Sequence, residues 1–133
     1  MAISSWGTPD RVPFLAIPMQ ITMQRLQVPP PPPGTPGPLS RPTPEAVGGL
    51  LEAAGFSDVE VEEAEVIIEW QSPGEFTTFV RETAPPITAM MAAHPKEVQD
   101  ETWAAITESV RQRAVDSGTV RVSNLALLAV GRA

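Results

Sequence analysis

The spacing of apolar side chains changes several times along the chain, and each change predicts a different element. Residues 2–6 form a short, largely apolar run that ends at a Gly-Thr-Pro-Asp turn, which is typical of a buried strand. Apolar residues in the segment 13–27 share one helical face, but Pro13 and Pro18 allow only short helical pieces. The sequence therefore predicts a strand followed by a loosely helical, apolar segment.

Proline dominates residues 28–42. Each proline fixes its own φ and restricts the residue before it, so we expect extended polyproline II and loop structure that acts as a semi-rigid spacer. A helix should follow, with Thr43 as N-cap, Pro44 at the first helical position, and the Glu45 carboxylate near the positive end of the helix dipole. Gly55 should end this helix. Its apolar stripe comprises Val47, Leu50, Leu51 and Ala54.

Two segments have the apolar patterns of strands. Residues 58–70 alternate between apolar and polar, and the alternation changes phase at Glu62 and Glu63, which predicts a bulge or a bend. Residues 119–130 combine alternation with a continuous apolar run, which indicates a final, well-buried strand. A solvated sheet face explains the acidic residues of the first segment more simply than a cation site does. These residues are Glu60, Glu62, Glu63, Glu65 and Glu69.

Helices should fill most of the chain between these two strands. Ser72 and Glu75 have the spacing of a capping box, and the proline pair at 85–86 stops the helix that they begin. A further helical turn or two is expected at residues 87–92. A longer helix is expected at about residues 96–115.

Length and composition indicate a single domain, residues 1–133, with a core that is small for the length. The chain is 42% hydrophobic, but 16 of its 133 residues are proline. Its net charge is −7, and the nine basic residues are scattered. Binding to nucleic acid or to an anionic membrane depends on Lys and Arg that neutralise phosphate, so we expect neither as a partner.

The chain contains no cysteine, which excludes disulfides, thiolate metal sites and a cysteine nucleophile. The first residues lack the basic start and the long apolar stretch of a signal peptide. The longest later apolar run, residues 125–130, is too short to span a bilayer. These features predict a soluble, cytoplasmic protein.

Four stretches of sequence carry a more specific signal. They are Ala-Ile-Ser-Ser-Trp-Gly at residues 2–7 with Pro9 and Pro13-Phe14, Leu-Leu-Glu-Ala-Ala-Gly-Phe-Ser-Asp-Val at residues 50–59, Ser72-Pro73 with Glu75-Phe76, and Asn-Leu-Ala-Leu-Leu-Ala-Val-Gly at residues 124–131. In this order they resemble the C-terminal half of class I S-adenosylmethionine-dependent methyltransferases, of the small-molecule type related to the ubiquinone and menaquinone methyltransferases. The likeness covers nearly the whole chain.

The resemblance implies an α/β fold. It would be a partial Rossmann-like methyltransferase sheet made of the last three strands, the final one antiparallel, with inserted helices on the substrate side. The segments that would match the family's fifth, sixth and seventh strands are residues 1–6, 58–70 and 119–130. Residues 43–54 would be the last helix that packs on the sheet, and residues 14–25 and 72–115 would roof the substrate pocket.

The sequence departs from the family at the cofactor site. That site comprises a glycine-rich turn, an acidic residue that holds the ribose hydroxyls and an adenine-contacting stretch, and none of these is present. The adjacent glycines Gly48 and Gly49 lie inside a predicted helix. We therefore expect a C-terminal portion of an enzyme whose cofactor is S-adenosylmethionine, in which residues 1–133 alone neither bind that cofactor nor transfer methyl groups.

The resemblance implies a small-molecule acceptor, and the apolar residues predict a hydrophobic one. Methyl transfer from a sulfonium mainly requires alignment and exclusion of water, so the sequence identifies no catalytic residue. Trp6 falls at the C-terminal end of the first strand, where ligands sit in open parallel sheets, and is expected to bind substrate. A pliable pocket wall, or alternatively ordinary core, would be formed by Phe14, Met19, Met23, Phe76, Phe79, Met90 and Met91.

Other interpretations remain open. His94, the single histidine, is interpreted as a loop residue rather than a general base, and no metal site is expected. The chain could instead be a non-enzymatic α+β binding or assembly module that pairs its first strand with another chain. An adaptor that presents the P-x-x-P pattern of residues 29–33 is a third interpretation. Unpaired backbone groups and apolar surface at residues 2–5 predict self-association.

Overall fold

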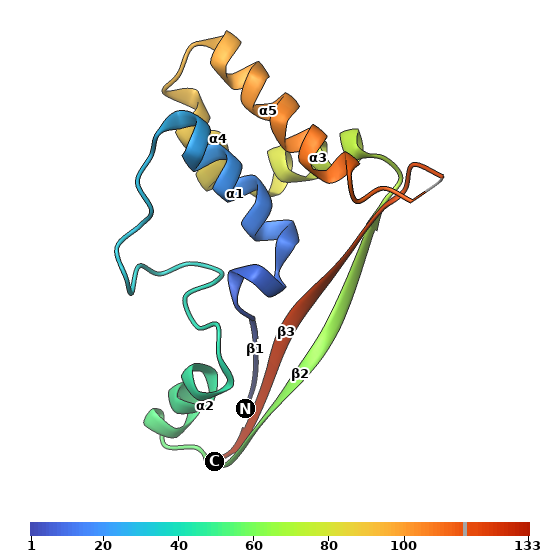
Figure 1. Ribbon diagram of the computed structural model, residues 1–133. Coiled ribbons are helices and arrows are strands. Elements are labelled where there is room, and N and C mark those ends of the chain that lie inside the picture. The colour runs from blue at the N-terminus through green and yellow to red at the C-terminus, as the bar shows by residue number, and fades with distance from the viewer. Residues whose placement is uncertain (116) are drawn as a thin grey trace. The chain divides into compact units, whose positions relative to one another are not determined.

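The computed structural model describes residues 1–115 and 117–133 (Figure 1). Within these residues the chain is α/β, with five α-helices, one short 3-10 helix and a three-stranded open antiparallel sheet. In chain order the elements are β1 Ala2–Trp6, the 3-10 helix Pro9–Arg11, α1 Pro13–Leu26, α2 Pro44–Ala53, β2 Ser57–Trp70, α3 Pro73–Thr83, α4 Pro85–Ala92, α5 Lys96–Arg111 and β3 Val120–Arg132. None of the helices in the described ranges has both the length and the apolar character that crossing a bilayer requires.

The chain forms two compact units. The first comprises residues 1–13, 31–67 and 123–133, and the second comprises residues 14–30 and 68–122. The first unit therefore contains β1, α2 and most of β2 and β3, whereas the second contains nearly all of α1 together with α3, α4 and α5. Between α1 and α2, residues 28–42 form turns and bends and no helix or strand.

The sheet of the first unit has the strand order β1-β3-β2. β1 pairs antiparallel with β3, in a register that places Ala2 opposite Val130 and Trp6 opposite Ala126. β1 and β2 run in the same direction, each antiparallel to β3 (Figure 1). The three predicted strands therefore lie in one sheet, and the last of them is the antiparallel one.

One face of this sheet packs against α2 and forms the core of the first unit. Val47 and Leu51 of α2 contact Leu125, Leu127 and Ala129, which alternate along β3 and so share one face. Partly buried side chains complete this core, namely Ile3, Phe56, Val59 and Val61. Burial of this apolar surface is the main contribution that holds the helix on the sheet.

Both ends of α2 confirm the sequence prediction. Thr43 Oγ1 accepts a backbone N–H of the first turn, as an N-cap does. At the other end Gly55 has φ 87°, and its N–H donates to the carbonyl of Glu52 at 2.9 Å. The N–H of Phe56 donates to the carbonyl of Leu51 at 3.0 Å. This pair of bonds is a Schellman motif, which needs a residue with positive φ and so favours glycine.

The packed face of α2 is narrower than the sequence predicts. Leu50 is 40% exposed and Ala54 is exposed as well. Gly48 faces the sheet instead, and a Cβ atom on it would lie 3.3 Å from Cγ2 of Val61. A Cβ on Gly49 would meet open space. The first of the two glycines thus allows the helix to approach β2 closely.

The second unit is a helical unit in which α3 and α5 pack together. Thr77 Oγ1 on α3 and Thr107 Oγ1 on α5 are hydrogen-bonded at 2.6 Å. The guanidinium carbon of Arg81 lies 4.7 Å from the centre of the Trp103 ring, a cation–π contact between the same helices. Buried apolar residues of the two helices are Phe76, Val80, Trp103, Ile106 and Val110.

The prediction of only short helical pieces in residues 13–27 is wrong, because α1 is one continuous helix that contains Pro18. Proline removes a single backbone bond from a helix interior, the one to the carbonyl four residues earlier. Phe14, Pro18, Thr22 and Leu26 recur every four residues and are all buried. This continuous buried stripe offsets the cost of the proline, and Thr22 Oγ1 donates to the Pro18 carbonyl at 2.7 Å.

α5 ends at Arg111, four residues before the predicted end at 115. Ala114, expected in the helix, forms an antiparallel bridge with Val120 at the start of β3. The N–H of Val115 donates to the carbonyl of Thr119 at 3.0 Å. Strand-type pairing therefore begins before β3 itself and competes successfully with a further helical turn.

The start of α3 yields a stability prediction. Ser72 Oγ accepts the N–H of Glu75 at 3.1 Å, and the Glu75 carboxylate accepts the N–H of Gln71, one residue before the N-cap. We expect Ser72→Ala to lower the free energy of unfolding by about 1 kcal/mol, because it leaves an N-terminal N–H of the helix without this acceptor. Urea denaturation followed by circular dichroism measures the change. Ser72→Gly should cost only a few tenths of a kcal/mol, and equal losses in the two variants would contradict the capping role.

Candidate functional site

Four aromatic rings meet in the second unit. The Trp70 ring, at the end of β2, contacts Phe76 of α3 edge-on, with ring centres 4.8 Å apart and planes at 88°. Trp70 also contacts Phe79 at 5.5 Å, and Phe79 contacts Phe14 of α1 at 6.5 Å. Edge-to-face and tilted contacts at these distances are favourable for aromatic rings. We call these four residues the aromatic cluster.

Burial divides the aromatic cluster into a packed interior and one accessible ring. Phe76 is 0% exposed, Trp70 is 5% exposed and Phe14 is also buried. Phe79 is only half-buried. Three rings therefore serve mainly as core, and Phe79 is the member that an apolar ligand can reach.

The aromatic cluster brings together three of the predicted substrate-binding residues, Phe14, Phe76 and Phe79. The four predicted methionines lie on the helices α1 and α4. Met91 is buried, and Met19, Met23 and Met90 are half-buried. Trp6 belongs to the first unit, where it is half-buried at the end of β1.

Trp70 is a cluster member that the sequence reasoning missed. The sequence does contain a signal for it. Trp70 is the last of the inward-facing residues that alternate along β2, and it directly precedes the cap region of α3. A large apolar residue at such a junction packs onto the first turn of the following helix, where Phe76 lies.

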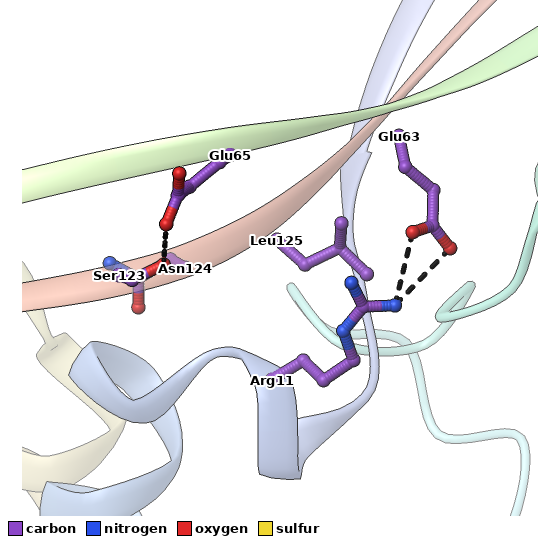
Figure 2. A pocket seen from close by; sticks show the side chains of 6 residues that line it. All are labelled: Arg11, Glu63, Glu65, Ser123, Asn124 and Leu125. Carbon is purple, nitrogen blue, oxygen red and sulfur yellow. Dashed lines mark hydrogen bonds and ion pairs between the residues drawn. The ribbon is translucent and has the colours of Figure 1, made fainter.

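A pocket of about 420 Å3 opens in the first unit between the sheet and the 3-10 helix (Figure 2). Its lining residues are Arg11, Glu63, Glu65, Ser123, Asn124 and Leu125. Arg11 Nη1 donates to both carboxylate oxygens of Glu63, at 3.1 and 3.3 Å. Ser123 Oγ donates to Oε1 of Glu65 at 2.6 Å. Sequence reasoning placed no residue here, because Arg11 and Ser123 are far apart in the chain.

The lining of this pocket is polar, and its side chains bind one another. The Arg11 and Glu63 side chains are about half exposed, and their charges offset each other in a surface ion pair. The hydroxyl of Ser123, on β3, donates to the carboxylate of Glu65, on β2. Asn124 is 2% exposed and donates to the carbonyl of Val66 at 3.3 Å, which ties β3 to β2. These contacts join β2 to β3 and to the 3-10 helix.

The remaining candidate groups are the glutamates of β2 and His94. All five glutamates of β2 are exposed, and three of them bind Arg11, Ser123 and Arg121, as a solvated sheet face predicts. His94 follows α4 in a loop, and its backbone carbonyl accepts from Gln99 Nε2 at 2.8 Å. Among the described residues, no group of three or more His, Cys, Asp and Glu side chains is arranged to hold a metal ion.

Comparison with known proteins does not add a family assignment. No protein-family model matches the sequence, and a search of curated proteins finds no match. What the chain does must therefore be inferred from its own residues and topology.

Proposed function

We propose that residues 1–133 are the C-terminal portion of a class I S-adenosylmethionine-dependent methyltransferase-like domain. The observation that carries this proposal is the order of the sheet. β1 and β2 run in the same direction, helices connect them along the chain, and the last strand, β3, lies antiparallel between them. A class I methyltransferase sheet ends in this arrangement, with its antiparallel last strand between the two that precede it.

The junction between α2 and β2 supports the same proposal. The segment that most resembles the family, residues 50–59, forms the end of α2, the Schellman turn at Gly55 and the start of β2. α2 packs its apolar face onto β3. In the family, the matching helix is the last one that covers the sheet, so the packing of α2 on the sheet supports the proposal.

The acceptor that fits this chain is a small, hydrophobic or aromatic molecule. Phe79 is half-buried and stands against the packed rings of Trp70 and Phe14. An apolar ring placed on Phe79 would gain both burial and edge-to-face contacts. Excluding water and holding the acceptor are the contributions that methyl transfer requires from this part of an enzyme.

The residues present do not fit S-adenosylmethionine itself. Gly48 and Gly49 are the adjacent glycines of the chain, and Gly48 is used for close packing against Val61 inside α2. No loop of consecutive backbone N–H groups is therefore formed there. We propose that the cofactor is bound by a segment outside residues 1–133.

Calorimetry with S-adenosylmethionine tests the proposal. Residues 1–133 should release no binding heat at cofactor concentrations up to the millimolar range. The coding sequence upstream of Met1 should contain, in frame, a strand followed by a glycine-rich turn. The extended polypeptide should then bind the cofactor with one-to-one stoichiometry and methylate an apolar acceptor.

Two results would contradict this proposal. Tight, stoichiometric binding of the cofactor by residues 1–133 would show that the site lies within the chain. An upstream sequence without a glycine-rich turn, together with no binding by any natural product of the gene, would instead favour the assembly module. The edge position of β1 in the sheet is the observation that favours that second function.

A further inference from the structure

β1 forms one edge of the sheet, and its hydrogen bonds show which residues face outward. Gly131 N–H donates to the Met1 carbonyl at 3.0 Å, and the Met1 amino group donates to the Gly131 carbonyl at 2.8 Å. In an antiparallel ladder such doubly bonded pairs alternate with pairs that do not bond. Ile3 therefore bonds to β3, whereas the backbone N–H and C=O groups of Ala2 and Ser4 point away from it.

The outward edge at Ala2 and Ser4 is accessible. Both residues are exposed, and neither backbone has a hydrogen-bond partner on the outer side among the described residues. β1 contains no charged residue and no proline, which are the usual features that prevent an edge strand from pairing. β2, the opposite edge of the sheet, carries five exposed glutamates. Only β1 is therefore chemically suited to accept a further strand.

We infer that β1 pairs with β1 of a second copy of this chain, in an antiparallel register centred on Ile3. The two outward-facing residues, Ala2 and Ser4, lie symmetrically on either side of Ile3. A two-fold axis at Ile3 therefore places Ala2 of each copy opposite Ser4 of the other, and each of these pairs exchanges both backbone hydrogen bonds. The two Ile3 side chains face each other and extend the apolar core on the α2 side of the sheet.

The register is limited to Ala2 and Ser4 because the other end of β1 is crowded. Ser5 Oγ donates to the carbonyl of Arg41 at 3.0 Å, so the loop before α2 lies beside that end of the strand. A register centred on Ser4 would require the outward groups of Trp6 as well. The register centred on Ile3 needs only the two exposed residues.

The strand β1 is uncharged, so a second copy can approach along it without direct charge repulsion at the seam, although each chain carries a net charge of −7. Leu128 and Val130 of β3, opposite Ser4 and Ala2 in the register, are 44% and 47% exposed. In the dimer both copies present this apolar face on one continuous sheet, next to the new seam. The inference concerns the polypeptide of residues 1–133 and does not rest on the proposed methyltransferase function; an upstream segment that completed the methyltransferase sheet would occupy this edge of β1 instead.

A single-cysteine cross-link tests the register, and the chain is suited to it because it contains no cysteine. In a non-hydrogen-bonded antiparallel pair the Cα atoms are about 4.5 Å apart, within the range that a disulfide spans. Under mild oxidation, Ile3→Cys should therefore form a covalent dimer at least about tenfold faster than Leu128→Cys. Equal rates, or a dimer in solution that Ile3→Cys does not cross-link, would overturn the register.

Analytical sedimentation of the full chain tests whether two copies associate through the edge strand β1. Ser4→Pro removes the backbone N–H of residue 4, which points away from β3. Proline is tolerated at such a position of an edge strand, so the pairing of β1 with β3 should persist. Ser4→Thr is the control that keeps this N–H. The unmodified chain and Ser4→Thr should show a concentration-dependent dimer. Ser4→Pro should weaken the association by about tenfold or more, because each copy loses one bond at the seam. A monomer for the unmodified chain at all concentrations would overturn the inference, and the cysteine variants decide it if Ser4→Pro does not fold.

Discussion

Phe76→Ala is expected to lower the free energy of unfolding by about 3–5 kcal/mol, which is a large part of the stability of a domain of this size. Phe76 is 0% exposed, and its ring is the edge-on partner of Trp70. Removing it deletes apolar contacts and leaves a cavity that α3 and β2 cannot close without moving. Urea denaturation measures the loss, and Trp fluorescence should change because the ring beside Trp70 is gone.

A matched variant separates apolar burial from ring geometry at this position. Phe76→Leu keeps most of the buried volume but removes the edge-to-face contact, which is worth about 0.5–1.5 kcal/mol beyond burial. We therefore expect Phe76→Leu to lose clearly less stability than Phe76→Ala. Equal losses would show that the ring contact with Trp70, and not the filled volume, dominates. A loss below about 1 kcal/mol in Phe76→Ala would contradict its place in the core.

The local signals in the sequence were sufficient for the strands, for the starts of α2 and α3, and for the end of α2. Thr43 and Ser72 are N-caps in the structure, and Gly55 has the positive φ expected of a helix-ending glycine. The alternation in β2 changes phase where it was predicted to, since Glu62 and Glu63 are both exposed. These features depend on neighbouring residues only, which is why they can be inferred without tertiary information.

The errors occurred where distant contacts decide the local structure. Pro18 is tolerated within α1 because that helix buries a continuous stripe of side chains. The local effect of proline on a helix does not reveal this burial. Ala114 pairs with Val120 rather than extending α5. Leu50 is exposed because Gly48 is the residue that lets α2 approach the sheet. Each error follows from a contact that outweighs a local preference, which is about 1 kcal/mol or less for an ordinary residue and about 3 kcal/mol for a proline inside a helix.

The candidate site was predictable only in part for the same reason. Phe14, Phe76 and Phe79 were predicted as one apolar group, and they meet in the aromatic cluster. Trp70 joins them from the end of a strand, and the pocket beside Arg11 forms from segments widely separated in sequence. Contacts of this kind can be predicted only when the order of the strands in the sheet is known. The periodicity of a single sequence does not specify that order.

Leu127→Ala is the prediction with the largest expected effect in the first unit, and the chain provides its own control at the next residue. Leu127 is 0% exposed in the core under α2, whereas Leu128 is 44% exposed on the opposite face of β3. We expect Leu127→Ala to lower the free energy of unfolding by about 2–5 kcal/mol. Leu128→Ala, the same chemical change on the same strand, should stay within about 0.5 kcal/mol.

The comparison must be made at one low protein concentration, because association through β1 would add to the apparent stability of both variants. Under these conditions a large difference between the two leucines establishes that α2 covers one face of the sheet and leaves the other open. Similar losses would mean that the face carrying Leu128 and Val130 is also buried, and that this part of the sheet has a second layer. A rise in the Leu128→Ala loss with protein concentration would show that copies also associate through this face, because pairing along the edge of β1 leaves it open.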